Sequence, residues 1–265
     1  SMFKKDRADF EAKWDDIKIF MEYGMLTDEK FFDRAQKSFL LKDTEGKCYT
    51  FDEYKEKIKE NQTNKDGKMV VLYSSNVNEQ HAYIDAAKNR GYNVVEMASP
   101  LTAHLLQQLE MKLENVTFTR VDSDTIDKLV QKEEVEKHNL SEDQEKELTA
   151  IIEGVVEKEK YSVQLENLNE KDSPMMITQS EFMRRMKEQS AVGGGGMMGM
   201  GNMPDMFNLV VNANHPLISK ILIETDADKK SKLAKQAADL AKLSQGLLVG
   251  SELTDFVKRS VELID

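Results

Sequence analysis

The chain has 265 residues, of which 32% are charged, and its formal net charge is −11 at pH 7. This acidic balance argues against a surface for nucleic acids or anionic membranes. No apolar run approaches the roughly 18–20 residues that cross a bilayer. The one cysteine, Cys48, cannot form an internal disulfide, which is typical of a reducing compartment. We therefore expect a cytoplasmic protein with no nucleic-acid partner and no membrane partner.

The first sixty residues are predicted to be a helical segment, residues 1–60. Apolar residues recur at helical spacing from Phe10 to Met21, and Gly24 is the expected end of that helix. Thr50 and Glu53 form a capping-box pattern, which predicts that another helix begins there.

Short apolar runs then alternate with helical patterns over residues 61–133. Met69–Tyr73, Val94–Met97 and Val116–Val121 are predicted strands, and helices are expected between them, at residues 77–90 and 101–113. This alternation predicts a small three-stranded parallel sheet covered by helices, which is an α/β subdomain.

A stretch dense in charge, residues 132–139, is the expected domain boundary, and residues 140–265 are expected to form an α+β domain. Ser141 and Gln144 form a second capping box. The remaining pattern predicts strands near residues 163–165, 175–177 and 207–212, a helix over 179–189 and two helices at the end.

The two final helices carry apolar and small residues on one face each. Two helices alone bury too little surface to be stable, and a two-fold related copy is the simplest partner. We therefore expect a homodimer held by a helical bundle, with the interface residues Leu233, Ala237, Leu240, Leu253, Phe256, Val257, Ser260 and Ile264.

Nine of the fifteen methionines lie between Met175 and Met206, around the four glycines at residues 193–196. Methionine is flexible and polarizable, so such a segment is typical of a surface that binds partners of varied shape. Two less specific interpretations stay open: ordinary core packing for the methionines before the glycines, and a linker without function for those after them.

Sequence patterns for catalysis or metal binding are missing. Gly193–Gly196 is not followed by the Lys-Ser or Lys-Thr of a phosphate-binding loop. A cysteine pair for zinc is absent, and the four histidines are scattered along the chain. We expect no catalytic residue, no metal and no cofactor in this chain.

Several segments, in order and spacing, resemble one family. Phe10–Asp16, Tyr23–Met25, Tyr49–Tyr54, Met69–Ser74 and Leu209–Leu217 are similar to stretches of the ninety-kilodalton heat-shock chaperones, and the bacterial members are most similar.

The resemblance implies that residues 1–60 and 61–133 are the late part of the middle domain, and that residues 140–265 are the C-terminal dimerisation domain. It implies a chaperone that binds unfolded or partly folded client proteins. The first residue, Ser1, is not an initiator, so we expect a piece of a longer protein. ATP and Mg²⁺ would then bind upstream, and this piece would not be an enzyme.

The resemblance also implies where clients bind. In the family, methionines four residues apart on a helix contact clients, and these positions align with Phe182 and Met186. Met183, Met197 and Met198 extend the apolar character. A client-facing tryptophan of the family aligns near His104 instead, so the resemblance does not extend client contact to residues 101–113.

Two other functions stay open from the sequence. A methionine-rich signal-sequence-binding domain of an RNA-associated targeting factor would need a basic surface and a GTPase phosphate loop, and neither is visible. A small-molecule enzyme built on the α/β half is the third possibility, although a fold alone does not imply an activity.

Overall fold

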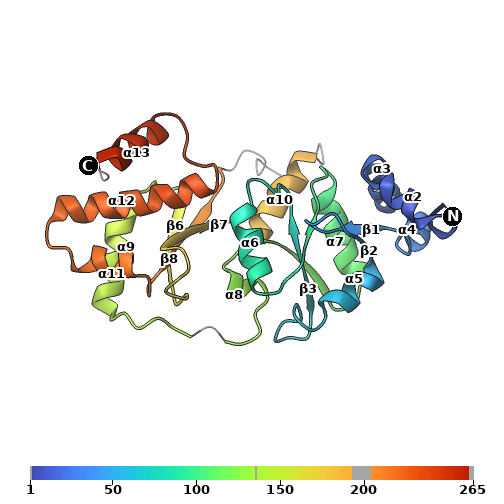
Figure 1. Cartoon of the computed structure of the whole chain (residues 1–265), viewed down its shortest axis with the longest axis horizontal. Coiled ribbons are helices and arrows are strands. Elements are labelled where there is room, and N and C mark those ends of the chain that lie inside the picture. Colours follow the sequence, from blue (N-terminus) through green and yellow to red (C-terminus); the bar gives the residue numbers. More distant parts are fainter. Residues whose placement is uncertain (1, 135, 193–203, 263–265) are drawn as a thin grey trace. The chain divides into compact units, whose positions relative to one another are not determined.

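The computed structural model describes residues 2–134, 136–192 and 204–262 and contains two compact units (Figure 1). Within these ranges the first unit comprises residues 2–133 and 181–192, and the second comprises the rest. Helix α10 (Glu181–Val192) is expected from the sequence in the C-terminal domain, yet it lies with the first unit.

Four helices open the first unit: α1 (Met2–Lys5), α2 (Arg7–Ala12), α3 (Trp14–Thr27) and α4 (Glu29–Ala35). The expectation that Gly24 ends a helix is wrong, because α3 continues to Thr27. The break falls at Asp28, whose carboxylate accepts a 3.0 Å hydrogen bond from the backbone N–H of Phe31 and so caps α4. Gly24 instead makes room for a ring, since a Cβ there would lie 2.7 Å from the Phe31 side chain.

A short hairpin and a capped helix follow. Strands β1 (Leu40–Lys42) and β2 (Cys48–Thr50) pair antiparallel, and α5 (Phe51–Ile58) begins directly after them. The predicted capping box is confirmed: the Thr50 hydroxyl accepts from the N–H of Glu53 at 3.3 Å, and the Glu53 carboxylate accepts from the N–H of Thr50 at 2.9 Å.

The predicted three-stranded parallel sheet is confirmed. It consists of β3 (Met69–Ser74), β4 (Val94–Glu96) and β5 (Val116–Arg120) in the order β4-β3-β5. The connecting helices are α6 (His81–Asn89) and α7 (Thr102–Lys112), and α8 (Ile126–Leu129) follows β5. The sheet and the N-terminal helices share one apolar core, in which Trp14 and Phe118 are buried.

The second unit is a mixed helix and sheet structure. Its sheet has the order β6-β8-β7, in which β8 (Phe207–Asn212) runs parallel to β6 (Tyr161–Glu166) and antiparallel to β7 (Met175–Thr178). The helices are α9 (Glu142–Glu153), α11 (Pro216–Ile223), α12 (Ala227–Ser244) and α13 (Gly250–Glu262). The predicted capping box at Ser141 and Gln144 begins α9.

The core of the second unit lies between this sheet and its helices. Four buried alanines of α12 let the helix approach the sheet closely, and the core cluster includes Leu148, Leu209 and Ile221. Within the described ranges, none of the helices combines the length and the apolar character that a membrane crossing requires.

Candidate functional site

Helix α10 is attached to the first unit by charged side chains. Glu181 Oε1 accepts a 2.8 Å hydrogen bond from the Tyr73 hydroxyl, and Glu181 Oε2 accepts from the N–H of Arg120 at 3.0 Å. Arg185 Nη2 donates to the carbonyl oxygen of Phe118 at 2.6 Å. The helix is therefore bound to β3 and to β5, which carry Tyr73, Phe118 and Arg120.

These bonds belong to a partly buried ion network. Arg185 pairs with Glu110 at 2.8 Å and with Glu181 at 2.6 Å, and Arg184 pairs with Glu181 at 2.7 Å. Burial favours the neutral form of Glu181, but the charges of Arg184 and Arg185 outweigh it and hold the pKa of this carboxyl below its usual value. Burial next to Glu181 raises the pKa of the Tyr73 hydroxyl, which keeps it a hydrogen-bond donor.

Two of the apolar side chains of α10 are exposed, whereas one of its arginines is buried. Phe182 is 68% exposed and Met183 is 39% exposed, whereas Arg184 is 6% exposed. No described residue of α10 belongs to the apolar core of the first unit. The helix thus docks through its polar face and leaves Phe182 and Met183 exposed, while Met186 is half-buried. This is the reverse of an ordinary amphipathic helix in a globular protein.

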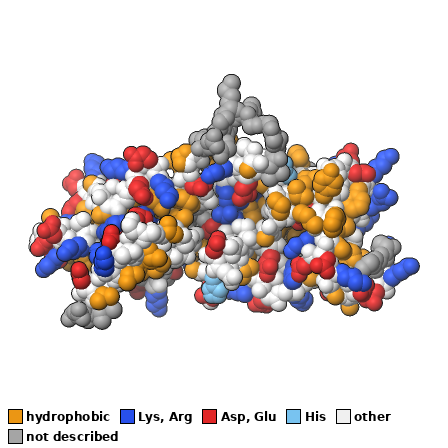
Figure 2. Space-filling view, turned by 90° about the horizontal axis from the view of Figure 1, so that it is seen from above, with side chains coloured by type: hydrophobic (Ala, Val, Ile, Leu, Met, Phe, Trp, Pro, Cys, Tyr) orange, Lys and Arg blue, Asp and Glu red, His pale blue; other side chains and the backbone are white. Residues whose placement is uncertain are grey.

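A groove of about 460 Å³ lies along α10. Three elements of the first unit line it: Gln107 and Glu110 from α7, Thr117–Thr119 from β5, and Glu181, Phe182, Arg185, Met186 and Gln189 from α10. On the face drawn in Figure 2, apolar side chains gather over the first unit. The groove combines polar and charged side chains with the apolar side chains of Phe182 and Met186, and it is large enough for side chains of another polypeptide.

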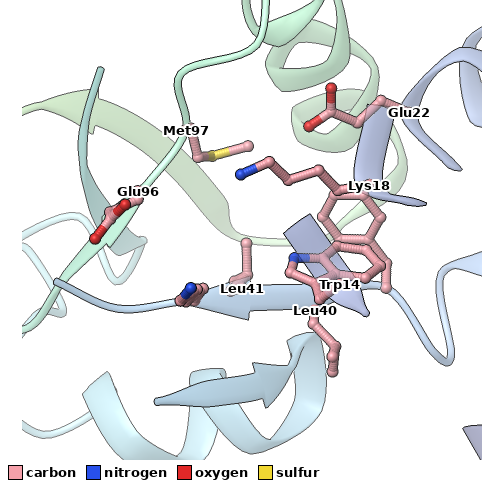
Figure 3. A pocket seen from close by; sticks show the side chains of 9 residues that line it. Trp14, Lys18, Glu22, Leu40, Leu41, Glu96 and Met97 are labelled. Carbon is pink, nitrogen blue, oxygen red and sulfur yellow. The ribbon is translucent and has the colours of Figure 1, made fainter. Parts of the chain in front are cut away.

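A second cavity in the first unit is far smaller. It encloses about 20 Å³ and is lined by residues that include Trp14, Lys18, Glu22 and Met97 (Figure 3). Such a volume corresponds to about one water molecule, so it excludes organic ligands. Burial raises the pKa of Glu22, although a hydrogen bond from Ser99 and the charge of Lys18 oppose the shift.

The final helices of the second unit present a different kind of surface. In α13, Phe256 is 7% exposed, and the ion pair between Arg259 and Asp239 joins α13 to α12. The next residue, Val257, is 52% exposed. Apolar side chains on the outside of the two helices are Leu240, Leu243, Val257 and Val261.

Comparison with known proteins decides the family. A family model described as "Hsp90 protein" matches residues 1–264. The chain belongs to the Hsp90 family. It is 40% identical to a chaperone protein HtpG of Bacteroides fragilis, an alignment that covers all of this chain and 48% of the relative.

Two further relatives agree with this assignment. An HtpG chaperone of Bacteroides thetaiotaomicron is 39% identical over the whole chain and 48% of its own length. An HtpG chaperone of Porphyromonas gingivalis is 42% identical over 91% of this chain and 36% of its own length. The chain thus spans about half the length, or less, of the curated relatives it matches. The targeting-factor alternative has no support from any of these comparisons.

The structure of this Hsp90-family chain brings part of the predicted client site together. Phe182 and Met186 both line the groove, while Met183 is exposed nearby on α10. Met197 and Met198 lie outside the described residues. Sequence patterns did not predict that α7 and β5 line the groove, because Gln107, Glu110 and Thr117 belong to no motif. The alternation of threonine with Phe118 in β5 was the one available sign that one face of this strand is polar.

The predicted dimer residues of this Hsp90-family chain separate into two groups. Ala237 and Phe256 are buried against their own chain, and Ser260 accepts a 2.9 Å hydrogen bond from Gln236. Leu240 and Val257 are exposed, whereas Leu233 and Leu253 are half-buried. Ile264 lies outside the described residues. Among the described residues, no cluster of side chains suited to a metal ion occurs.

Proposed function

We propose that this chain is part of an ATP-dependent chaperone and that it binds unfolded or partly folded client proteins in the groove between α7, β5 and α10. The observation that carries the proposal is the docking of α10 through its polar face, which leaves Phe182 68% exposed beside the groove. The relatives named HtpG are chaperones by name, which supports the same function.

The chemistry of the groove suits clients of no fixed sequence. Burying a large apolar side chain contributes about 1.5–3 kcal/mol, so Phe182 and Met186 together supply useful affinity without demanding one sequence. Met186 and the neighbouring Met183 can adapt to side chains of different shape. The net charge of −11 favours solubility while these side chains are exposed.

Homodimerisation is the second part of the proposed function. Leu240, Leu243, Val257 and Val261 give α12 and α13 an exposed apolar face, and packing against a two-fold related copy would cover it. We place ATP and Mg²⁺ binding in the part of the relatives that this chain does not span, and we propose a cytoplasmic location.

The client site is tested with the variant Phe182→Ser/Met186→Ser. We expect its affinity for an unfolded, fluorescently labelled globular protein to fall by about tenfold or more, because two apolar contacts are lost. The matched control is Phe20→Ser, which removes another exposed phenylalanine, 74% exposed on α3. If the double variant and the control bound the client equally well, the groove would not be the client-binding site.

A further inference from the structure

Strand β5 lies at one edge of its sheet, and its outward backbone groups are bonded by side chains. Among the described strands, β5 pairs only with β3. The N–H of Phe118 donates to Glu110 Oε1 at 2.7 Å, and the carbonyl oxygen of Phe118 accepts from Arg185 at 2.6 Å. The N–H of Arg120 donates to Glu181 Oε2 at 3.0 Å. Three successive groups on this edge thus have charged partners.

This order of donor, acceptor and donor is the one that a neighbouring strand would satisfy. Backbone groups of every second residue face the same side of a strand, and Phe118 and Arg120 are two residues apart. Two of the three partners, Arg185 and Glu181, belong to α10. The helix therefore occupies the hydrogen-bonding edge that an added strand would use, and it protects that edge from uncontrolled pairing.

The contacts between α10 and β5 are of a kind that another ligand can replace. They are hydrogen bonds between charged side chains and backbone groups, and no described apolar side chain of α10 enters the core of the first unit. The attraction within a buried ion pair is largely offset by the cost of removing its charges from water. Strand pairing would restore a bond to each backbone group of the edge and would return the charged side chains to water.

The groove runs beside the same edge. Thr117 and Thr119 of β5 line it together with Phe182 and Met186. A segment lying along β5 would therefore meet backbone groups on one side and apolar side chains on α10. Alternate residues of such a segment would direct their side chains into the groove, because side chains alternate along a strand.

We infer that a client segment binds here in extended conformation, as an added strand on β5 that displaces all three charged partners of its outward backbone groups, Glu110 of α7 included. This inference rests on the proposed function and specifies the form of the client. The favoured segment is unfolded, free of proline, and carries β-branched or aromatic residues at alternate positions. Proline is excluded because it has no N–H to donate.

The first test uses a fluorescein-labelled peptide of about ten residues with alternating valine and serine. In a second version every valine carries a backbone N-methyl group, and in a third version every serine does. We expect one methylated version to bind at least about tenfold more weakly than the unmodified peptide, because its methyl groups face β5. Equal affinity of all three peptides would overturn strand addition.

The second test separates this inference from the proposed function. The protein has 11 phenylalanines, so ¹⁵N-phenylalanine labelling resolves the backbone amides of Phe118 and Phe182 by NMR. We expect the unmodified peptide to shift both signals. A shift of Phe182 alone would keep the client site and overturn strand addition. No shift of either signal would overturn both.

Discussion

Arg185 donates a hydrogen bond of 2.6 Å to the carbonyl oxygen of Phe118, a residue 67 positions earlier in the chain. The same guanidinium pairs with Glu110 at 2.8 Å. One side chain of α10 therefore holds both a strand edge and a neighbouring helix, while Phe182 on the same helix is left exposed. Local detachment of α10 would free the β5 backbone groups that it bonds, while Glu110 of α7 would still hold the N–H of Phe118.

Arg185→Ala should loosen α10 while the first unit stays folded. The substitution removes the ion pair with Glu110 and leaves the carbonyl of Phe118 without its side-chain donor, which costs about 1–3 kcal/mol. Hydrogen exchange of the α10 amides measures this loss, because it reports local opening. We expect the urea transition of Trp14, the only tryptophan and one buried in the core, to change little.

A double-mutant cycle provides the control for this prediction. The double variant Glu110→Gln/Arg185→Ala should lose less hydrogen-exchange protection of α10 than the two single variants lose in sum, because both substitutions remove the same ion pair. Additive losses would mean that the pair does not couple α7 to α10. If Arg185→Ala lowered the free energy of unfolding measured at Trp14 by as much as it lowered the protection of the α10 amides, α10 would be an integral part of the fold.

Val257→Glu should split the proposed dimer without unfolding the protomer. Val257 is 52% exposed in the single chain, so the charge is tolerated there, but it becomes unpaired in an apolar interface. Light scattering measures the mass, and circular dichroism follows the helices. A Val257→Glu protein that kept the mass of a dimer would place the interface elsewhere.

Phe256→Ala is the informative comparison for the same surface. Phe256 is 7% exposed and packs within its own chain, so its truncation should destabilise the attachment of α13, by up to about 3–5 kcal/mol. A charged residue at position 256 would therefore be an ambiguous test of dimerisation, although the sequence pattern alone suggests it. We expect Phe256→Ala to lower the melting temperature of the protomer. We expect Val257→Glu to leave the melting temperature of the protomer unchanged.

Glu22→Gln should stabilise the protein increasingly as the pH rises. Burial raises the pKa of Glu22 above its usual value of 4.5, so the folded state holds this proton more tightly than the unfolded state does. The contribution is fully present below pH 4.5 and is lost as the pH rises through the folded-state value. Glutamine stays neutral, so the variant avoids that loss.

Melting temperatures measured over a pH series check this prediction. The difference between Glu22→Gln and the unmodified protein should be small in acid and should grow toward neutral pH. Glu79→Gln, which makes the same substitution at an exposed glutamate of the same unit, serves as the control. A difference that is constant with pH would mean that Glu22 does not ionise over this range.

Much of the local structure follows directly from the sequence. Both predicted capping boxes, at Thr50 and at Ser141, are present, and the three short apolar runs after residue 68 form the expected parallel sheet. Capping depends on residues three positions apart, and buried strands depend on a short run of apolar residues. The error at Gly24 arose because its role depends on the ring of Phe31, a contact that helical spacing does not reveal.

The amino-acid sequence by itself determined most of the helices and strands, the acidic balance and the position of Phe182 and Met186 on one helix, but not the β1–β2 hairpin. The tertiary structure alone decided which face of that helix is exposed. The reason is physical: the charges of Glu181 and Arg185 have partners on β5 and α7, more than 60 positions away in the chain. No local pattern encodes those partners, and they reverse the orientation that amphipathicity would favour.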